Sequence, residues 1–261
     1  MKDYLGYAEK KCVVIGGSSG MGKACTEMLL DLGAEVYVLD IMPCDVPGVT
    51  FYEADLQDRE GLKAVFEKLP KFDKFFGWAG VSGKFEKGAM VAINILSYMY
   101  ILDELLYDKM NEHGAALFNV SIAGEGWESS YEKYKYFFEH SYEESIEWAR
   151  NEAKGSVYVL TKQALNYYVV VKHFEKYGEK WIRLNCISPG LTKSRLRQDF
   201  VDGYPGPAED ISGTALKRDA EVHDQARAGI AINSDLFGYV AGTITYVDGG
   251  HHASSVAKSL R

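Results

Sequence analysis

Residues 13–22 read Val13-Val14-Ile15-Gly16-Gly17-Ser18-Ser19-Gly20-Met21-Gly22, and this stretch determines the fold of the 261-residue chain. An apolar run of strand length leads into clustered glycines, and a helical pattern follows over residues 20–32. Glycines between a strand and a helix allow a tight turn, and they let the backbone approach a pyrophosphate at the positive end of the helix dipole. The stretch therefore predicts a strand–turn–helix unit that binds a nucleotide.

The rest of the chain alternates strand-length apolar runs with helical patterns, which predicts a parallel sheet with helices on both faces. We expect helices at 20–32, 58–69 (with Asp58 as N-cap), 89–110 and 155–177. We expect strands at 11–15, 35–39, 49–52, 74–78, 115–120, 181–187 and 243–247.

The segment 126–154 departs from this alternation. Its sequence is glutamate-rich, and its apolar residues recur at helical spacing: Trp127, Tyr131, Tyr134, Phe138, Tyr142, Ile146 and Ala149. We therefore expect a helical insertion there.

The composition indicates one globular domain over residues 1–261, because no linker, repeat or low-complexity tract divides the chain. The net charge of −8 disfavours nucleic acid as a partner. Four scattered cysteines fit a reducing compartment, and the polar N-terminus lacks the apolar core of a signal peptide. We read no apolar run as clean enough to span a membrane. These features predict a soluble, cytoplasmic protein without a membrane partner.

Four residues downstream carry the chemical prediction. Tyr158 and Lys162 are spaced by one helical turn, so they share a helix face. Ser121 ends the expected fifth strand, and Asn94 lies inside a strongly apolar helix. Together with the glycine turn, this set resembles the short-chain dehydrogenase/reductase family over nearly the whole chain. The resemblance implies a Rossmann-type doubly wound α/β fold, and an oxidoreductase that interconverts a secondary alcohol and a ketone.

The resemblance assigns a role to each of these four residues. A tyrosine has a pKa near 10, and a neighbouring ammonium lowers it by favouring the phenolate. Lys162 is placed to lower the pKa of Tyr158, the proposed base, and by resemblance it also holds the nicotinamide ribose. Ser121 is expected to hold the substrate oxygen. Asn94 is expected to support a water-linked proton path to the lysine, although a polar residue that bends the helix is the alternative.

The expected cofactor is NAD. Asp40 lies 18 residues beyond Gly22, where a carboxylate accepts hydrogen bonds from ribose hydroxyls and repels a 2′-phosphate. Neither Ser19 nor Ile41 is basic, whereas NADP-preferring members of the family usually carry an arginine or lysine at such a position. The alternative is that Asp40 only caps a loop. The expected cofactor contacts are Gly16, Ser18, Ser19, Gly20, Met21, Gly22, Asp40, Asp55, Leu56, Ala79, Gly80, Tyr158, Lys162, Pro189, Gly190, Leu191 and Thr192.

Two positions depart from the family pattern. Ile15 stands where the family usually has threonine, and Trp78 stands within a turn that usually reads Asn-Asn-Ala-Gly. Polar groups are therefore missing from both turns. We expect the two losses to be linked, with an apolar contact in place of a hydrogen-bonded one.

The substrate is encoded less clearly than the reaction. Ser121 and Tyr158 lie 37 residues apart, farther than in the common family pattern, and this insertion resembles the bacterial 3α-hydroxysteroid dehydrogenase/carbonyl reductase subgroup. We expect an apolar small-molecule substrate, a hydroxysteroid or bile acid, sheltered by the insertion and by a lid at about 193–217. The insertion could instead cover the helices through which family members associate, or pack as an extra helix.

Several alternatives stay open. The substrate could be a smaller ketone, an aromatic alcohol or a polyol, or the protein could be a pseudoenzyme that binds NAD and acts through partner association. The apolar helices around Asn94 and Tyr158 predict a homodimer or homotetramer, because exposing both would leave large apolar patches. We expect no metal site, since His251 and His252 have no further ligands nearby in the sequence.

Overall fold

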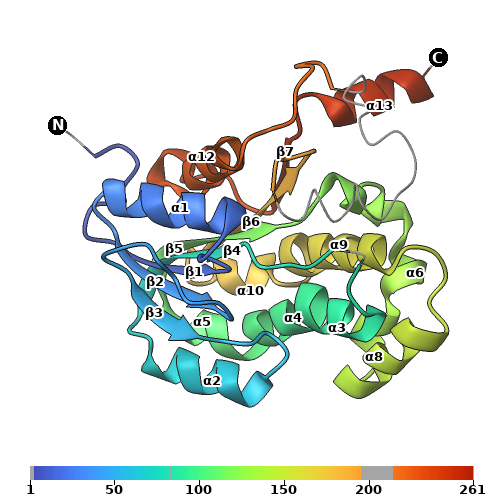
Figure 1. Ribbon diagram of the computed structural model, residues 1–261, viewed down its shortest axis with the longest axis horizontal. Helices are drawn as coiled ribbons and strands as arrows, with labels where there is room; N and C mark the ends of the chain where they lie inside the picture. Colours follow the sequence, from blue (N-terminus) through green and yellow to red (C-terminus); the bar gives the residue numbers. More distant parts are fainter. Residues whose placement is uncertain (1–2, 83, 195–213, 261) are drawn as a thin grey trace.

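One seven-stranded sheet organises the computed structural model, which describes residues 3–82, 84–194 and 214–260 (Figure 1). The strands are all parallel and follow the order β3-β2-β1-β4-β5-β6-β7. Their bounds are β1 Lys11–Ile15, β2 Glu35–Asp40, β3 Thr50–Glu53, β4 Phe72–Gly77, β5 Met110–Asn119, β6 Arg183–Pro189 and β7 Thr243–Val247. The strand order reverses between β1 and β4, and ligands of doubly wound sheets bind at such a point, beyond the carboxyl ends of the strands.

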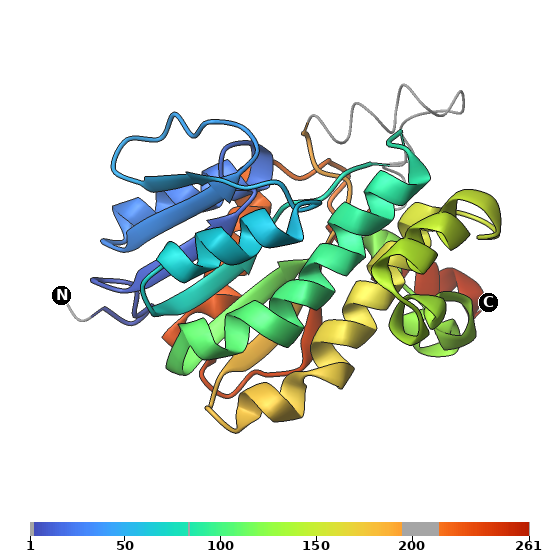
Figure 2. The ribbon, with the colours of Figure 1, turned by 90° about the horizontal axis from the view of Figure 1, so that it is seen from below.

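Helices cover both faces of the sheet, as the α/β pattern predicted (Figure 1). On one face α1 (Gly20–Asp31) and α12 (Val222–Asn233) pack against each other over a buried cluster that includes Val14, Phe76 and Ile230. On the other face a larger cluster lies beneath α2 (Arg59–Lys68), a long helix over 87–109, and α9 (Val157–Tyr167). Figure 2 shows the helices of this second face side by side.

Two long helices are divided into several elements by π-helical turns, which are wider than α-helical turns. The first helix contains two such turns and the second contains one. The first comprises α3 Lys87–Val91, η1 Ala92–Leu96, α4 Ser97–Tyr100, η2 Ile101–Leu105 and α5 Leu106–Lys109. The second comprises α9, η5 Tyr168–Lys172 and α10 Phe174–Gly178. The remaining described elements are η3 Ile122–Gly124, η4 Trp127–Ser129, α6 Tyr131–Tyr134, α7 Tyr136–Glu139, α8 Tyr142–Asn151, η7 Asp235–Phe237 and α13 His251–Ser259.

The expected elements agree with the observed ones to within a few residues, apart from a longer β5. The strands at 11–15 and 243–247 are as predicted. Asp58 is the N-cap of α2, because its carboxylate accepts the Gly61 N–H at 2.9 Å. β5 begins at Met110 rather than at residue 115, because Met110 pairs with Phe72 ahead of a shift in register.

The expectation that no apolar run could span a membrane needs correction. By length and composition alone, the helix Lys87–Lys109 passes that test. In this fold 67% of its most apolar window is buried inside the protein. Tyr98, Ile101 and Leu102 in its middle are almost fully enclosed. Its apolar character is therefore used in packing against the sheet.

The insertion is not one helix. Its apolar stripe is divided among η4, α6, α7 and α8, and the last of these begins with a capping box formed by Ser141 and Glu144. The stripe packs on α9: Tyr131 and Phe138 lie 5.0 Å and 5.3 Å from the ring of Tyr167. The insertion therefore extends the helical layer.

The insertion also covers the helices that were expected to form an intermolecular interface. α8 packs on α3, where a Cβ on Gly88 would lie 2.7 Å from Ile146, and Arg150 pairs with Glu86 at 2.9 Å. Among the large apolar side chains of Lys87–Lys109 and Val157–Lys172, only Val171 is counted as exposed. Within the described residues, these helices therefore do not expose the large apolar patches from which we expected association, and the dimer or tetramer stays a prediction.

Candidate active site

The glycine turn connects β1 to α1 and is shaped by close backbone contacts. Gly16 has a φ of +80°, and a Cβ there would lie 2.6 Å from the backbone nitrogen of Ala79. A Cβ on Gly22 would lie 2.0 Å from the Gly16 carbonyl oxygen. Gly20 has a φ of +55° and no neighbouring atom within 4 Å of such a Cβ. Two glycines are thus required for packing, and the third lines an open cleft.

Asp40 ends β2 beside this turn. Its carboxylate accepts the N–H groups of Ser18 and Met42, each at 3.0 Å. Ser18 also donates its hydroxyl to the Met42 carbonyl at 2.8 Å, so the loops after β1 and β2 are joined. Asp40 also lines a cleft that is described below.

Ile15 and Trp78 do not make the apolar contact that the sequence led us to expect. Ile15 belongs to the core cluster on the α2 face, whereas Trp78 belongs to the cluster beneath α1 and α12. A Cβ on Gly229 of α12 would lie 2.8 Å from the indole of Trp78. The two turns are held by backbone bonds instead, because the N–H groups of Trp78 and Ala79 both donate to the Ile15 carbonyl.

Tyr158 and Ser121 meet at the carboxyl end of β5. Ser121 precedes η3 and accepts the Ala123 N–H at 3.1 Å, which fixes its hydroxyl. Tyr158 lies in the first turn of α9 and is 8% exposed. Burial raises the pKa of the Tyr158 phenol, and a hydrogen bond with Ser121 opposes that rise. The lowering of this pKa by Lys162, which the sequence predicted, is not the main influence.

Lys162 is buried one turn beyond Tyr158, with its Nζ 5.8 Å from the centre of the tyrosine ring. Its ammonium donates to the Asn119 carbonyl at 3.2 Å. Burial lowers the pKa of Lys162 to about 8. The lysine is thus held in place while its charge is poorly solvated.

Asn94 lies in η1, a wider turn of the kind that often marks functional sites. Its side chain accepts the Val81 N–H at 2.8 Å and donates to the Val81 carbonyl at 3.0 Å. A Cβ on Gly80 would lie 3.3 Å from Asn94 Oδ1 and 3.4 Å from Lys162 Nζ. Asn94 therefore fixes the turn after β4 against the lysine.

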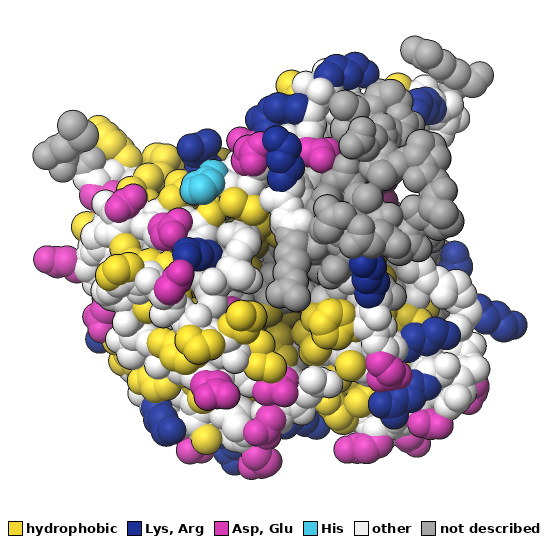
Figure 3. All heavy atoms as spheres, in the orientation of Figure 1, with side chains coloured by type: hydrophobic (Ala, Val, Ile, Leu, Met, Phe, Trp, Pro, Cys, Tyr) yellow, Lys and Arg dark blue, Asp and Glu magenta, His cyan; other side chains and the backbone are white. Residues whose placement is uncertain are grey.

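A cleft of about 660 Å³ brings these groups together. Every expected site residue lines the cleft except Ser18 and Asn94. These two residues hydrogen-bond to the lining residues Asp40 and Val81. Sequence reasoning missed further apolar lining residues, since only their place in the fold brings them there: Ile41, Met42, Val81, Phe85, Ile93, Val120 and Ile122. In Figure 3 hydrophobic side chains gather across the middle of one face of the molecule.

Two predicted features around the cleft, the insertion and the lid, have different outcomes. No described residue of the insertion lines it, so a shelter made by Trp127, Tyr131 or Tyr134 is not found there. Most of the expected lid at 193–217 lies outside the described residues. At its margins Ser194 lines the cleft, and Lys193 pairs with Glu221.

Comparisons with known proteins show what the chain is similar to. A family model described as enoyl-(acyl carrier protein) reductase matches residues 142–252. Coniferyl-alcohol dehydrogenase of Pseudomonas sp. (strain HR199) is 27% identical over 249 residues, which cover 92% of this chain and 96% of the relative.

Two solved structures share the fold. The 3-alpha-hydroxysteroid dehydrogenase from Pseudomonas sp. B-0831, complexed with NADH, gives a TM-score of 0.80 at 24% identity, over 95% of this chain and 99% of that one. A short chain dehydrogenase family protein from Francisella tularensis gives a TM-score of 0.74 at 21% identity, over 94% and 100%.

These similarities support an oxidoreductase of the dehydrogenase class that acts on CH–OH groups. In fold the chain resembles the short chain dehydrogenase family over 94% of its length, and the matching family model covers residues 142–252.

Proposed function

We propose that this protein is an NAD-dependent dehydrogenase that interconverts a secondary alcohol and a ketone. The observation that carries the proposal is the meeting of Tyr158, Ser121 and Lys162 in one cleft with the glycine turn. A chance Tyr-x-x-x-Lys spacing would not place a hydrogen-bonded serine beside the tyrosine. Nor would it place Lys162 Nζ 3.4 Å from the position of a Cβ on Gly80, which follows Ala79, the residue in contact with Gly16.

The cleft fits a dinucleotide. Gly20 lines it in open space, and Gly16 and Gly22 allow the close backbone approach that a pyrophosphate needs. Asp40, Asp55 and Leu56 line it as well, on the side of β2 and β3. These residues would hold the adenosine half, and Tyr158 and Lys162 the nicotinamide ribose. When bound, the nicotinamide supplies the hydride acceptor or donor.

The chain's own residues handle the proton. In oxidation the phenolate oxygen of Tyr158 accepts the hydroxyl proton of the substrate, while Ser121 Oγ donates a hydrogen bond to the substrate oxygen. Lys162, held by Asn119, stabilises the phenolate electrostatically. Asn94 keeps the turn at Gly80 and Val81 in place beside that ammonium.

The preference for NAD rests on Asp40. Its carboxylate is anchored by two backbone N–H groups and lines the cleft, so a 2′-phosphate would meet a fixed negative charge. Ile41 and Met42, the next residues along, also line the cleft and bring no positive charge. Comparable catalytic efficiency with NAD and NADP would contradict this assignment.

For the substrate we propose a hydroxysteroid or bile acid. The cleft that contains Ser121, Tyr158 and Lys162 is also lined by the apolar residues Val81, Phe85, Ile93 and Ile122, which suits an apolar molecule with one reacting hydroxyl. The fold similarity to a 3-alpha-hydroxysteroid dehydrogenase supports this class. A smaller aromatic alcohol is the second candidate, because coniferyl-alcohol dehydrogenase is similar over 92% of the chain.

The test is NADH formation from NAD with hydroxysteroids, bile acids, coniferyl alcohol and simple secondary alcohols. Turnover confined to one steroid position would support the first candidate, and turnover of coniferyl alcohol alone would replace it with the second. Tyr158→Phe should remove turnover in either case while NADH still binds. Because burial raises the Tyr158 pKa, oxidation should accelerate as the pH rises above neutrality, and ketone reduction should slow.

A further inference from the structure

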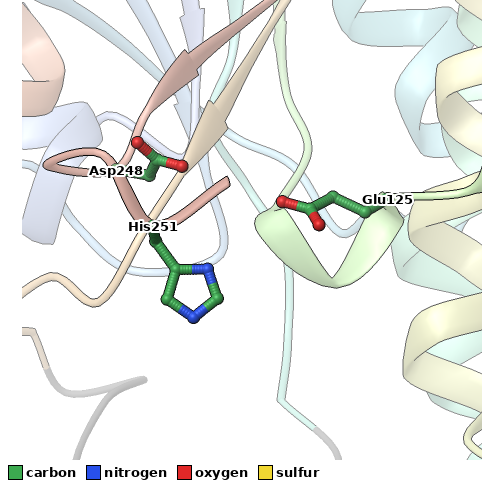
Figure 4. Close-up of side chains that lie close together, drawn as sticks. All are labelled: Glu125, Asp248 and His251. Carbon is green, nitrogen blue, oxygen red and sulfur yellow. The ribbon is translucent and has the colours of Figure 1, made fainter. Parts of the chain in front are cut away.

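Three side chains of the types that bind metals lie close together beside the cleft, and they come from two parts of the chain that are far apart in the sequence (Figure 4). Glu125 follows η3 after β5, Asp248 follows β7, and His251 begins α13. One ligand atom from each lies within 4.8 Å of the other two. Figure 4 shows Glu125 reaching from its own loop toward the pair formed by Asp248 and His251. We expected no metal site at His251 and His252 from the sequence, because Glu125 lies more than a hundred residues away from them along the chain.

Two atoms of the cluster are buried without a hydrogen bond. Glu125 Oε1 and His251 Nδ1 have no hydrogen-bond partner among the described residues. Glu125 Oε1 does lie 3.1 Å from Nδ1 of His252, but the two groups are not aligned for a hydrogen bond. Buried polar atoms are nearly always satisfied by protein, water or an ion. A cation bound between Glu125 Oε1 and His251 Nδ1 would satisfy the lone pairs of both atoms.

The cluster is built on ordered elements. Asp248 is 8% exposed, and its carboxylate accepts the N–H groups of Gly250 at 2.8 Å and His252 at 2.7 Å. Gln163 of α9 donates to the Glu125 carbonyl at 2.9 Å, which fixes that loop. Ligating carboxylates are typically oriented by such outer hydrogen bonds. The donors are therefore held in place by the fold.

The donor set selects the kind of ion. One imidazole and two carboxylates suit zinc and similar divalent transition metals, whereas calcium and magnesium prefer oxygen donors alone. Two carboxylates also balance a divalent charge. No described lysine or arginine forms an ion pair with Glu125 or Asp248.

We propose that Glu125, Asp248 and His251 bind one divalent transition-metal ion, with His252 available as a further donor. The ion would join the loop after β5 to the loop after β7. Ser121 lies four residues before Glu125. Gly190, which lines the cleft, packs against Asp248, because a Cβ added to Gly190 would lie 2.7 Å from Asp248 Cα. The site would thus stiffen two walls of the substrate cleft without taking part in hydride transfer.

The test is calorimetric titration of the tag-free, chelator-treated full chain with Zn²⁺ and, separately, with Mg²⁺. We expect one Zn²⁺ per chain and no competition from Mg²⁺. Glu125→Gln and His251→Ala should each weaken Zn²⁺ binding at least about tenfold. His223→Ala is the matched control, because His223 is an exposed histidine on α12 that is not a member of the cluster, and it should bind as the parent does.

Circular dichroism establishes that each variant is folded before titration, and Glu125→Gln preserves side-chain volume in case His251→Ala unfolds. Three results would overturn the proposal. The first is no saturable Zn²⁺ binding by the parent. The second is an equal loss in His223→Ala, which would indicate adventitious surface binding. The third is unchanged affinity in Glu125→Gln, which would leave Glu125 and His252 as a simple ion pair.

Discussion

Replacing Lys162 with methionine should stabilise the cofactor-free protein while removing its activity. Burial lowers the pKa of Lys162 from its usual 10.5 to about 8. At 1.36 kcal/mol for each pKa unit, the buried ammonium costs about 3 kcal/mol at pH 7. Methionine removes that cost and leaves the Asn119 carbonyl without its 3.2 Å hydrogen bond, a loss of about 1 kcal/mol. The net gain is about 2 kcal/mol, which corresponds to a rise in Tm of roughly 4–8 °C.

The pH dependence separates this reasoning from a general packing effect. Below the folded pKa of about 8, Lys162 is charged in both the folded and the unfolded states, so the full penalty applies. Above 10.5 it is neutral in both states and the penalty is absent. The wild type should therefore gain stability between these values, and the advantage of the variant should disappear.

The assay is urea unfolding followed by circular dichroism at several pH values without cofactor. Lys63→Met on the exposed surface of α2 is the control, and its effect should stay within about 0.5 kcal/mol at every pH. A Lys162→Met protein that is less stable than the wild type at pH 7, or whose advantage is constant with pH, refutes the argument.

Three further predictions concern the turn, the cofactor and the insertion. Gly22→Ala should abolish NADH binding, measured by fluorescence titration, because its Cβ would lie 2.0 Å from the Gly16 carbonyl oxygen; normal affinity would show that the turn can adjust. Asp40→Asn should raise the efficiency with NADP relative to NAD at least about tenfold, or about 1.4 kcal/mol, and an unchanged ratio would remove Asp40 as the selector. Tyr134→Ala should cost about 3–5 kcal/mol of unfolding free energy, because Tyr134 is 0% exposed, yet leave KM unchanged; a raised KM on an intact fold would restore a substrate role for the insertion.

The sequence predicted the parts of this fold that depend on local contacts. Residues 13–22 form the turn they were expected to form, because glycine conformation and strand–helix alternation act over a few residues. Tyr158 and Lys162 share a face of α9 because a helical turn sets their spacing. Ser121 reaches them because the carboxyl ends of parallel strands meet at one edge of the sheet.

The surroundings of these groups could not be read from the chain. The lining residues Phe85 and Ile93 belong to no motif. The path of the insertion depends on its packing against α3 and α9, which are distant from it in the fold's chain order or separated from it by loops. The expected contact between Ile15 and Trp78 was wrong because neighbouring turns can direct their side chains to opposite faces of the sheet.

By itself, then, the sequence predicted the α/β architecture from short-range patterns, and its resemblance to a known family implied the reaction class and the residues proposed for proton transfer. Only the tertiary structure decided that the insertion covers α3 and α9, and that Lys162 carries a poorly solvated charge. It alone brought Glu125, Asp248 and His251 within 4.8 Å of one another. The physical reason is that burial and long-range proximity depend on how the whole chain packs.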